Sequence, residues 1–179
     1  MVRLSDLPAL ATYPGDNAQY IADLYSIFER DFIHNRASFG SHPLALKHFP
    51  PVDGYPHVFY HMVTCGADEQ NRTLDLPRCE RLPWARPTVE NVETWNLRCW
   101  EQNRRGKSRV CIALEVDNGD HYYMILDVRK TYVLLWTAYY ANYPHEVAKK
   151  NREYQAWLRS VSGQPKTPDE LIADIQSRI

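Results

Sequence analysis

Three closely spaced strand-like segments constrain the fold of this chain most strongly. Residues 109–116, 122–128 and 132–140 are each rich in branched and aromatic side chains, which favour β-strands. The links Asp117–Asp120 and Arg129–Lys130 are short. Links of this length join antiparallel neighbours, whereas parallel strands need a crossover of roughly a dozen residues or more. We therefore expect an antiparallel meander.

Helices are predicted on both sides of the meander in the sequence. Asp16 or Asn17 can cap a helix in which apolar residues recur at helical spacing. Pro87 and Pro144 each suit the first turn of a helix, where the missing backbone donor costs nothing. The predicted helices cover residues 18–33, 88–95, 144–158 and 169–178. Together these elements predict an α+β fold with helices packed on one face of a small antiparallel sheet.

The segments upstream of the meander are less regular. Residues 38–56 hold several prolines and glycines, which predicts an irregular connection with a short helical turn over residues 44–49. Residues 57–63 are apolar and aromatic, and we predict a strand that carries His61 near its end. Residues 64–77 are polar and are expected to form an exposed loop.

The strand predicted over residues 57–63 bears on metal binding. His57 and His61 are four residues apart, a spacing that puts two ligands on one face of a helix, whereas a strand is predicted here. The sequence also lacks a carboxylate cluster for two magnesium ions, a glycine-rich phosphate loop, a serine elbow and a dinucleotide fingerprint. We therefore expect no metal and no cofactor.

Composition indicates a single globular domain. The chain has 179 residues, of which 44% are hydrophobic and 12% aromatic, enough to build a substantial core. No apolar run approaches the roughly 18 to 20 residues that span a bilayer, and the first residues lack the apolar core of a secretory signal. The four cysteines show no C-x-x-C spacing, so we interpret them as reduced thiols. We expect a cytoplasmic protein with no membrane partner.

Charge is nearly balanced overall but is uneven along the chain. A net charge of -1 argues against a histone-like nucleic-acid binder. Residues 98–109 nevertheless carry five basic side chains against Glu101, a local charge of +4. This segment is either a phosphate-binding surface or a solvated basic turn. The residues that we predict to contact RNA are Arg104, Arg105, Lys107 and Arg109, with Trp84 as a stacking surface for a base.

His61 is the best candidate for proton transfer. Cleavage of RNA by its own 2'-hydroxyl needs a base, an acid and cations that stabilise the phosphoryl oxygens. Imidazole titrates near neutral pH, which suits the first two roles. A lone histidine among aromatic residues is more often structural, and that alternative stays open.

Three arginines are candidates for binding the phosphate. Arg78, Arg81 and Arg86 lie in a proline-containing segment that leads into a predicted helix. The guanidinium group binds phosphate through two parallel charge-assisted hydrogen bonds. The alternative is that one or more of these arginines form salt bridges with Glu80 or Glu90.

The last strand of the predicted meander ends in hydroxyl groups. Alternation along a strand places Thr137 and Tyr139 on one face of the sheet and Tyr140 on the other. Thr137 and Tyr139 are therefore the candidates to line a pocket, although aromatic residues on strands are most often part of the core.

The order of these segments resembles a known group of nucleases. These are the phage and toxin-system nucleases grouped with barnase, EndoU, certain colicins and RelE. The likeness extends over residues 59–157. The matching segments are Phe59–His61, Arg78–Trp84 leading into Glu90–Asn91, Trp100–Glu101 before a basic turn, the strand Tyr122–Val128, Thr137–Tyr140 and the helical Lys149–Tyr154.

The resemblance implies a metal-independent endoribonuclease with a RelE- and barnase-like fold, a helical layer against a twisted four-stranded antiparallel sheet. It implies an active site at His61, Arg81 and Thr137, with Arg78 and Tyr139 as supporting candidates. Arg86 joins this second group. The expected partners are single-stranded RNA or tRNA and an antitoxin or another protein. The expected parts are an N-terminal helical extension over 1–56, a nuclease-like core over 57–160 and a short C-terminal helix over 161–179.

Two other functions agree with the same sequence. The first is a non-catalytic phage protein that uses the basic segment to bind RNA or a host protein, since a scaffold does not by itself imply activity. The second is a tRNA-modifying or transferase enzyme that uses the same pocket.

Overall fold

The computed structural model describes residues 1–69, 71–104 and 106–179. Within these ranges the largest sheet has six strands in the order β1-β2-β8-β7-β6-β5. The strands are β1 (Ser38–Phe39), β2 (His42–Leu46), β5 (Arg98–Arg104), β6 (Lys107–Glu115), β7 (His121–Val128) and β8 (Val133–Tyr140). A second sheet pairs β3 (Thr64–Cys65) with β4 (Thr73–Leu74).

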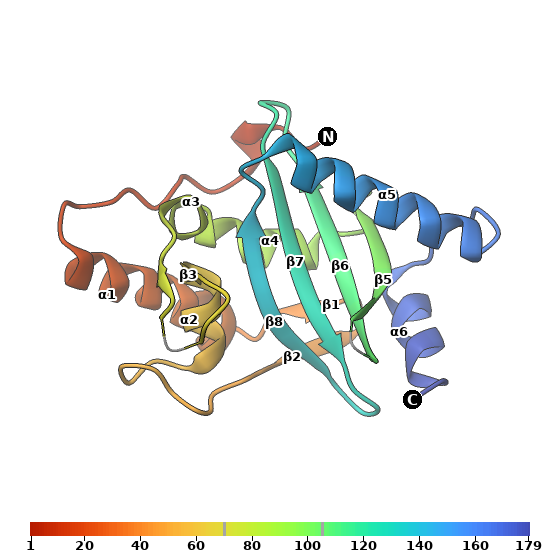
Figure 1. Cartoon of the computed structure of the whole chain (residues 1–179), viewed down its shortest axis with the longest axis horizontal. Helices are drawn as coiled ribbons and strands as arrows, with labels where there is room; N and C mark the ends of the chain where they lie inside the picture. The colour runs from red at the N-terminus through yellow and green to blue at the C-terminus, as the bar shows by residue number, and fades with distance from the viewer. Residues whose placement is uncertain (70, 105) are drawn as a thin grey trace.

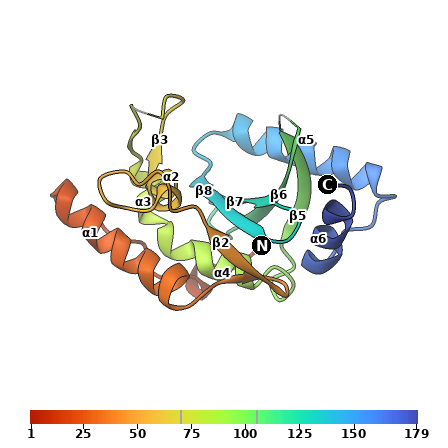
Figure 2. The same ribbon diagram turned by 90° about the horizontal axis from the view of Figure 1, so that it is seen from below.

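Helices lie on both faces of the large sheet (Figures 1 and 2). They are α1 (Asn17–Phe28), α2 (His57–Val63), α3 (Leu76–Glu80), α4 (Ala85–Glu90), α5 (Pro144–Ser160) and α6 (Pro168–Gln176). Shorter turns are η1 (Leu4–Asp6), the π-helical η2 (Glu29–His34) and η3 (Leu82–Trp84). Helix α5 crosses one face and α4 lies against the other, which corrects the prediction that helices cover one face only. No helix in the described ranges is long and apolar enough to cross a membrane.

The predicted antiparallel meander is confirmed. Strands β6, β7 and β8 pair antiparallel in sequence order, with Cys111 opposite Ile125 and Ile125 opposite Thr137. The register between β7 and β8 shifts at Ile125 and Leu126. Ile125 lies opposite Thr137 and Leu126 lies opposite Leu135, so Trp136 is the extra residue between the two pairs. A bulge of this kind changes the direction in which a side chain points.

The sheet is mixed rather than wholly antiparallel, and it is larger than the predicted four strands. Strand β2 pairs parallel with β8, with Leu44 opposite Val133. The prediction of a helical turn at residues 44–49 was therefore wrong for Leu44–Leu46. These residues pair with the edge of β8, which would otherwise be open, and the pairing buries Leu44. Pairing between distant segments thus overrides the local preference for a helical turn.

The predicted strand over residues 57–63 is helix α2, which is the correction that matters most for function. Its buried residues include Val58, Phe59, Met62 and Val63, which recur at the spacing of a helix. Phe59 packs against the rings of α1, with its centroid 5.4 Å from that of Phe28. A short aromatic run fits a strand or a helix equally well in sequence, and packing against α1 and β8 decides between them.

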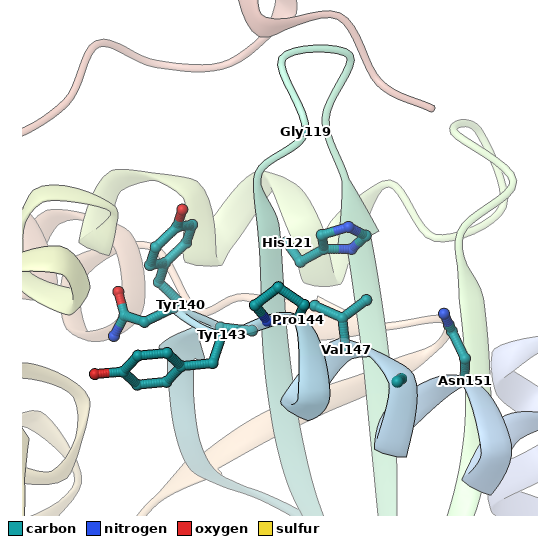
Figure 3. A pocket seen from close by; sticks show the side chains of 10 residues that line it. Gly119, His121, Tyr140, Tyr143, Pro144, Val147 and Asn151 are labelled. Atoms are coloured by element: carbon teal, nitrogen blue, oxygen red, sulfur yellow. The ribbon is translucent and has the colours of Figure 1, made fainter.

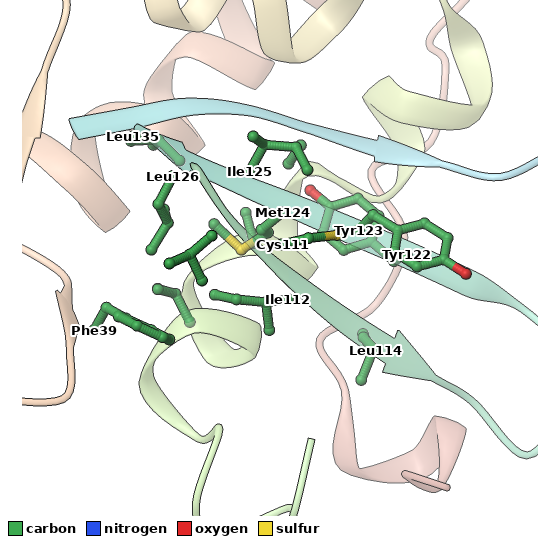
Figure 4. Packing of buried hydrophobic residues seen from close by; sticks show 14 of the residues in the cluster. Phe39, Cys111, Ile112, Leu114, Tyr122, Tyr123, Met124, Ile125, Leu126 and Leu135 are labelled. Atoms are coloured by element: carbon green, nitrogen blue, oxygen red, sulfur yellow. The ribbon is translucent and has the colours of Figure 1, made fainter. Parts of the chain in front are cut away.

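One hydrophobic core extends through all three parts expected from the sequence. Figure 4 shows its centre, where side chains of β6 and β7 such as Ile112 and Met124 pack together. The core also includes Phe28 from the first 56 residues and Ile175 from the last 19. The extensions at both ends therefore complete the same core as the meander.

Candidate active site

Helix α2 presents His57 and His61 on one face. Their imidazole rings stack with centroids 4.4 Å apart. The side chains are 12% and 10% exposed. Residues four apart lie above one another on a helix, so the helical conformation of α2 brings the two rings together.

The carboxylate of Glu69 meets the histidine pair from the loop between β3 and β4. Its Oε2 atom lies 2.7 Å from Nε2 of His61 and 3.8 Å from Nε2 of His57. The Glu69 side chain is 59% exposed, so solvent reaches this side of the cluster. Burial raises the pKa of Glu69, but the hydrogen bond with His61 and the nearby positive charges outweigh it and hold the pKa below its ordinary value. Glu69 is therefore an anion that orients His61.

Arg72 fixes the loop that carries Glu69. Its guanidinium donates to Oγ1 and the carbonyl oxygen of Thr64, at 2.9 and 2.7 Å, and to the carbonyl oxygen of Gly66 at 2.8 Å. Its Nη1 atom also lies 3.8 Å from Oε1 of Glu69. Gly66 has a φ of +141°, and a Cβ atom there would lie 3.2 Å from Cα of Arg72. A glycine at this position lets the two sides of the loop approach each other.

Lys47 adds a positive charge beside the histidines. It follows β2, and its Nζ atom lies 3.4 Å from Nε2 of His57 and 5.6 Å from the centre of the Trp136 ring. The Trp136 ring centre lies 6.2 Å from that of His61, and the guanidinium of Arg109 lies 4.3 Å from the Trp136 ring. The site therefore continues from α2 onto the face of the large sheet.

Burial lowers the pKa of both imidazoles. For His57 the positive charges of His61 and Lys47 lower the pKa further. For His61 the hydrogen bond with Glu69 opposes the effect of burial without cancelling it. Lower pKa values favour neutral imidazoles at neutral pH, and a neutral imidazole is the form that accepts a proton.

Thr137 and His61 meet, although 76 residues separate them in the sequence. The Thr137 hydroxyl donates to the backbone carbonyl oxygen of His61 at 3.1 Å. Nη1 of Arg78 donates to the same oxygen at 3.4 Å and to the carbonyl oxygen of Thr64 at 3.1 Å. Thr137 and Arg78 thus hold the backbone of α2 in place. They position His61 without touching its imidazole.

Arg81, which was predicted to bind phosphate, pairs with protein carboxylates instead. Its Nη2 atom lies 3.0 Å from Oδ2 of Asp120, and its Nη1 atom lies 3.3 Å from Glu80. The guanidinium lies 3.8 Å from the centre of the Tyr140 ring. The alternative of a salt bridge with Glu80 is therefore correct, and Arg81 links α3 to the β6–β7 turn.

Arg86 is also engaged within the protein. It forms two hydrogen bonds with the Glu90 carboxylate, each of 3.0 Å, and Nη1 donates to the backbone oxygens of Asp31 and Asn35. These contacts join α4 to the end of η2. Arg86 therefore lies away from the histidine cluster and has a structural role.

Trp84 and Tyr139 contribute to the core. Trp84 is 0% exposed, and its Nε1 atom donates to the carbonyl oxygen of Pro8 at 3.0 Å. The prediction that Trp84 stacks on an RNA base is therefore wrong. The Tyr139 ring packs on Tyr123, and the Arg78 guanidinium lies 5.4 Å from its centre.

The basic segment over residues 98–109 forms β5, a turn and the start of β6 rather than a turn alone. Arg98 forms an ion pair with Glu115, and Arg104 pairs with Glu153 at 2.9 Å. Part of the local positive charge is thus neutralised by carboxylates from elsewhere in the chain.

The other predicted RNA contacts differ in their positions. Lys107 is exposed at the beginning of β6. Arg109 lies against Trp136 beside the histidine cluster. The prediction for Arg105 falls outside the described residues. Among the described members of this set, the fold brings Arg109 to the candidate site.

Four members of the cluster were not predicted as functional residues: Lys47, His57, Glu69 and Arg72. The spacing of His57 and His61 is a signal in the sequence, but it indicates neighbouring side chains only in a helix, and a strand is predicted there. Glu69 and Lys47 carry no local signal, because long-range pairing of β2 with β8 and a loop conformation bring them to α2.

A separate pocket lies where β8 leads into α5 (Figure 3). It has a volume of about 390 Å³, and the labelled side chains that line it include His121, Tyr140 and Asn151. The Tyr140 hydroxyl donates to Asp120, and Asn151 accepts a hydrogen bond from Arg98. Tyr140 and Asn151 therefore already have protein partners, whereas the buried Nδ1 of His121 has no hydrogen-bond partner among the described residues. The pocket lining does not include His57 or His61.

Comparisons with known proteins identify no relative. A scan against models of protein families found no match, and searches of curated proteins and of solved structures found none.

Proposed function

We propose that this protein is a metal-independent endoribonuclease whose active site is the cluster around His61. The observation that carries the proposal is the convergence of Nε2 of His57, Nε2 of His61, a Glu69 oxygen and Nζ of Lys47. Taken in the order His61, Glu69, His57 and Lys47, neighbouring atoms lie 2.7, 3.8 and 3.4 Å apart. Two imidazoles, a carboxylate and an ammonium group can supply the base, the acid and the cation that cleavage by the RNA 2'-hydroxyl needs.

The reaction breaks the bond between phosphorus and the 5'-oxygen as the 2'-oxygen bonds to phosphorus. His61, oriented by Glu69, accepts the proton of the 2'-hydroxyl. His57, beside Lys47, gives a proton to the departing 5'-oxygen in the molecules in which it is protonated, which are the smaller fraction at neutral pH because its pKa is lowered. The products are a 2',3'-cyclic phosphate and a 5'-hydroxyl end. Lys47 stabilises the negative charge that develops on the phosphoryl oxygens.

This assignment moves phosphate binding away from the predicted arginines. Arg81 and Arg86 contact the carboxylates of Asp120 and Glu90. The cations beside the histidine cluster are Lys47 and Arg109, which lie 5.6 and 4.3 Å from the centre of the Trp136 ring. Trp136 is partly exposed and supplies an aromatic face on which a base could stack. Stacking requires an unpaired base, so the proposed substrate is single-stranded RNA or a tRNA loop.

The wider proposal follows the nucleases that the sequence resembles. It includes a RelE- or barnase-like origin for the scaffold, a cytoplasmic location with the RNA substrate, and an antitoxin protein as partner. The antiparallel meander with flanking helices supports this origin. The added parallel strand β2 departs from the expected four-stranded sheet, and it is the element that leads to Lys47.

Cleavage of RNA in the presence of EDTA tests the proposal. Purified protein should cut total RNA or tRNA into fragments with 2',3'-cyclic phosphate ends. His61→Ala should lower the rate by about 100-fold or more, since general acid–base catalysis contributes roughly that much. His34→Ala is the matched control, because His34 is exposed at the end of η2.

Two results would contradict the proposal. Equal rates for the wild type and His61→Ala, with both proteins folded, would remove His61 from the reaction. Binding of RNA without cleavage would favour the non-catalytic alternative, in which the basic residues near β5 and β6 form an interaction surface.

A further inference from the structure

The ligand-bearing atoms of His57, His61 and Glu69 lie within 4.8 Å of one another. The histidines come from one face of α2, and the carboxylate comes from the β3–β4 loop, so three side chains converge from two elements. A strand at residues 57–63 would argue against metal binding. The helix argues for it, because two histidines four apart on a helix are a known arrangement for a zinc ion.

We propose that His57, His61 and Glu69 bind one divalent ion of the zinc type. Imidazole nitrogen and carboxylate oxygen suit zinc, with bond lengths of about 2.0 to 2.2 Å. The separations of Glu69 Oε2 from the two Nε2 atoms, 2.7 and 3.8 Å, lie on either side of the spacing around such an ion. The stacked imidazoles, 24° from parallel, must also rotate so that the ion lies in the plane of each ring. Three protein ligands leave a fourth position open to water.

The surroundings of the three side chains both support and limit binding. Arg72 holds the loop of Glu69 through three hydrogen bonds to Thr64 and Gly66, so the carboxylate is already placed before an ion arrives. Lys47 has the opposite effect, because its ammonium group lies 3.4 Å from Nε2 of His57 and repels a cation. We therefore expect a reversible site rather than one that the fold depends on.

The consequence for activity rests on the proposed function. Nε2 of His61 donates to the Glu69 carboxylate, so Nδ1 of the neutral ring holds the lone pair that accepts a proton from RNA. When zinc takes Nε2, the hydrogen of the neutral ring is on Nδ1, and neither nitrogen keeps a free lone pair. A bound zinc ion should therefore inhibit RNA cleavage, which makes the site a means of regulation.

Calorimetric titration of the purified, EDTA-treated and desalted protein with Zn²⁺ tests the site without using activity. We expect one ion per chain for the wild type and for the control His34→Ala. His57→Ala and Glu69→Gln should each weaken binding by more than about tenfold, since even loss of groups that only support ligands costs 10- to 100-fold. Circular dichroism establishes that each variant is folded.

Absence of one-to-one binding, or equal affinity in folded His57→Ala and Glu69→Gln, would overturn the metal site. Lys47→Met provides an independent arm whose two effects have opposite signs. It should strengthen zinc binding because a repelling charge is removed, and slow RNA cleavage because the phosphate loses a cation. Unchanged or weaker zinc binding in this variant would contradict the proposed geometry.

The two proposals can fail separately. Zinc binding that depends on His57 and Glu69, in a protein that does not cleave RNA, would support the site and reject the nuclease. Cleavage in EDTA that zinc leaves unchanged would support the nuclease and reject inhibition. Cleavage that requires zinc would reject the metal-independent mechanism.

Discussion

Individual side chains divide into those that position the site and those that complete the fold. The Thr137 hydroxyl and the Arg78 guanidinium both donate to the backbone oxygen of His61, so they act on the reacting group through the backbone. Arg81 instead donates to Asp120 and lies against the Tyr140 ring. The role of an arginine in a sequence motif therefore depends on the groups that its guanidinium contacts in the fold.

Asp120 provides a test of the structural role of Arg81. Burial raises the pKa of Asp120, but hydrogen bonds from Arg81 and Tyr140 outweigh it and hold the pKa below the ordinary value of 3.8. A carboxyl whose pKa is lower when folded stabilises the protein above its unfolded pKa. That stabilisation is lost as the pH falls from about 4 to 5 toward the folded pKa.

We expect Asp120→Asn to lower the free energy of unfolding by about 1.5 to 3 kcal/mol at pH 7, the range for hydrogen bonds to charged groups. The difference between variant and wild type should shrink at pH 3. Urea unfolding at both pH values measures it. Glu80→Gln is a control, because its side chain is more exposed and pairs with the same arginine. A difference independent of pH would contradict the assignment.

Among the elements, the meander could be predicted and α2 could not. Strands β6 to β8 pair with sequence neighbours through short turns, so local patterns suffice. The seven residues of α2 are too few for periodicity to separate a helix from a strand, and the rings of α1 decide the outcome. Residue type was therefore enough to identify His61 as a candidate. Its contact with His57 could be predicted only if residues 57–63 were recognised as a helix.

The β3–β4 loop shows how an element sets the geometry of the site. Its Gly66 has a positive φ and lies against the backbone of Arg72. Gly66→Ala should destabilise the protein by about 1 kcal/mol or more, because alanine does not fit this conformation. It should also lower the rate of RNA cleavage, because the loop must shift and move Glu69 away from His61.

Gly163→Ala is the matched control for Gly66→Ala. Gly163 also has a positive φ, but no atom lies within 4 Å of the Cβ position, and it follows α5. We expect a similar loss of stability without loss of cleavage per folded molecule. Thermal unfolding and initial rates measure the two effects. Equal cleavage rates for the two variants would show that the loop geometry does not matter for Glu69.

At the scale of the whole molecule, the candidate site depends on contacts between distant parts of the chain. Lys47 follows a strand that pairs with β8, Glu69 comes from a loop, and Trp136 lies at an irregularity in the sheet. The placement of Lys47 depends on pairing across 89 residues, from Leu44 to Val133. The loop of Glu69 and the irregularity at Trp136 lie between residues close in sequence, but residue types alone do not predict their geometry. The sequence identified His61, Thr137 and Arg109 by residue type, and the fold supplied their neighbours.

The last 19 residues test whether the ends of the chain are appendages or part of the core. Leu171, Ile172 and Ile175 in α6 are each 0% exposed. Burying a large aliphatic side chain contributes roughly 1.5 to 3 kcal/mol, so the three together contribute about 5 to 9 kcal/mol. The total stability of a domain is only about 5 to 15 kcal/mol.

We therefore expect deletion of residues 161–179 to abolish cooperative thermal unfolding. The control variant Gln164→Ala changes an exposed side chain of the same segment and should retain a cooperative transition. A cooperative transition in the deletion variant would mean that the segment is an appendage, as the predicted division into three parts implies.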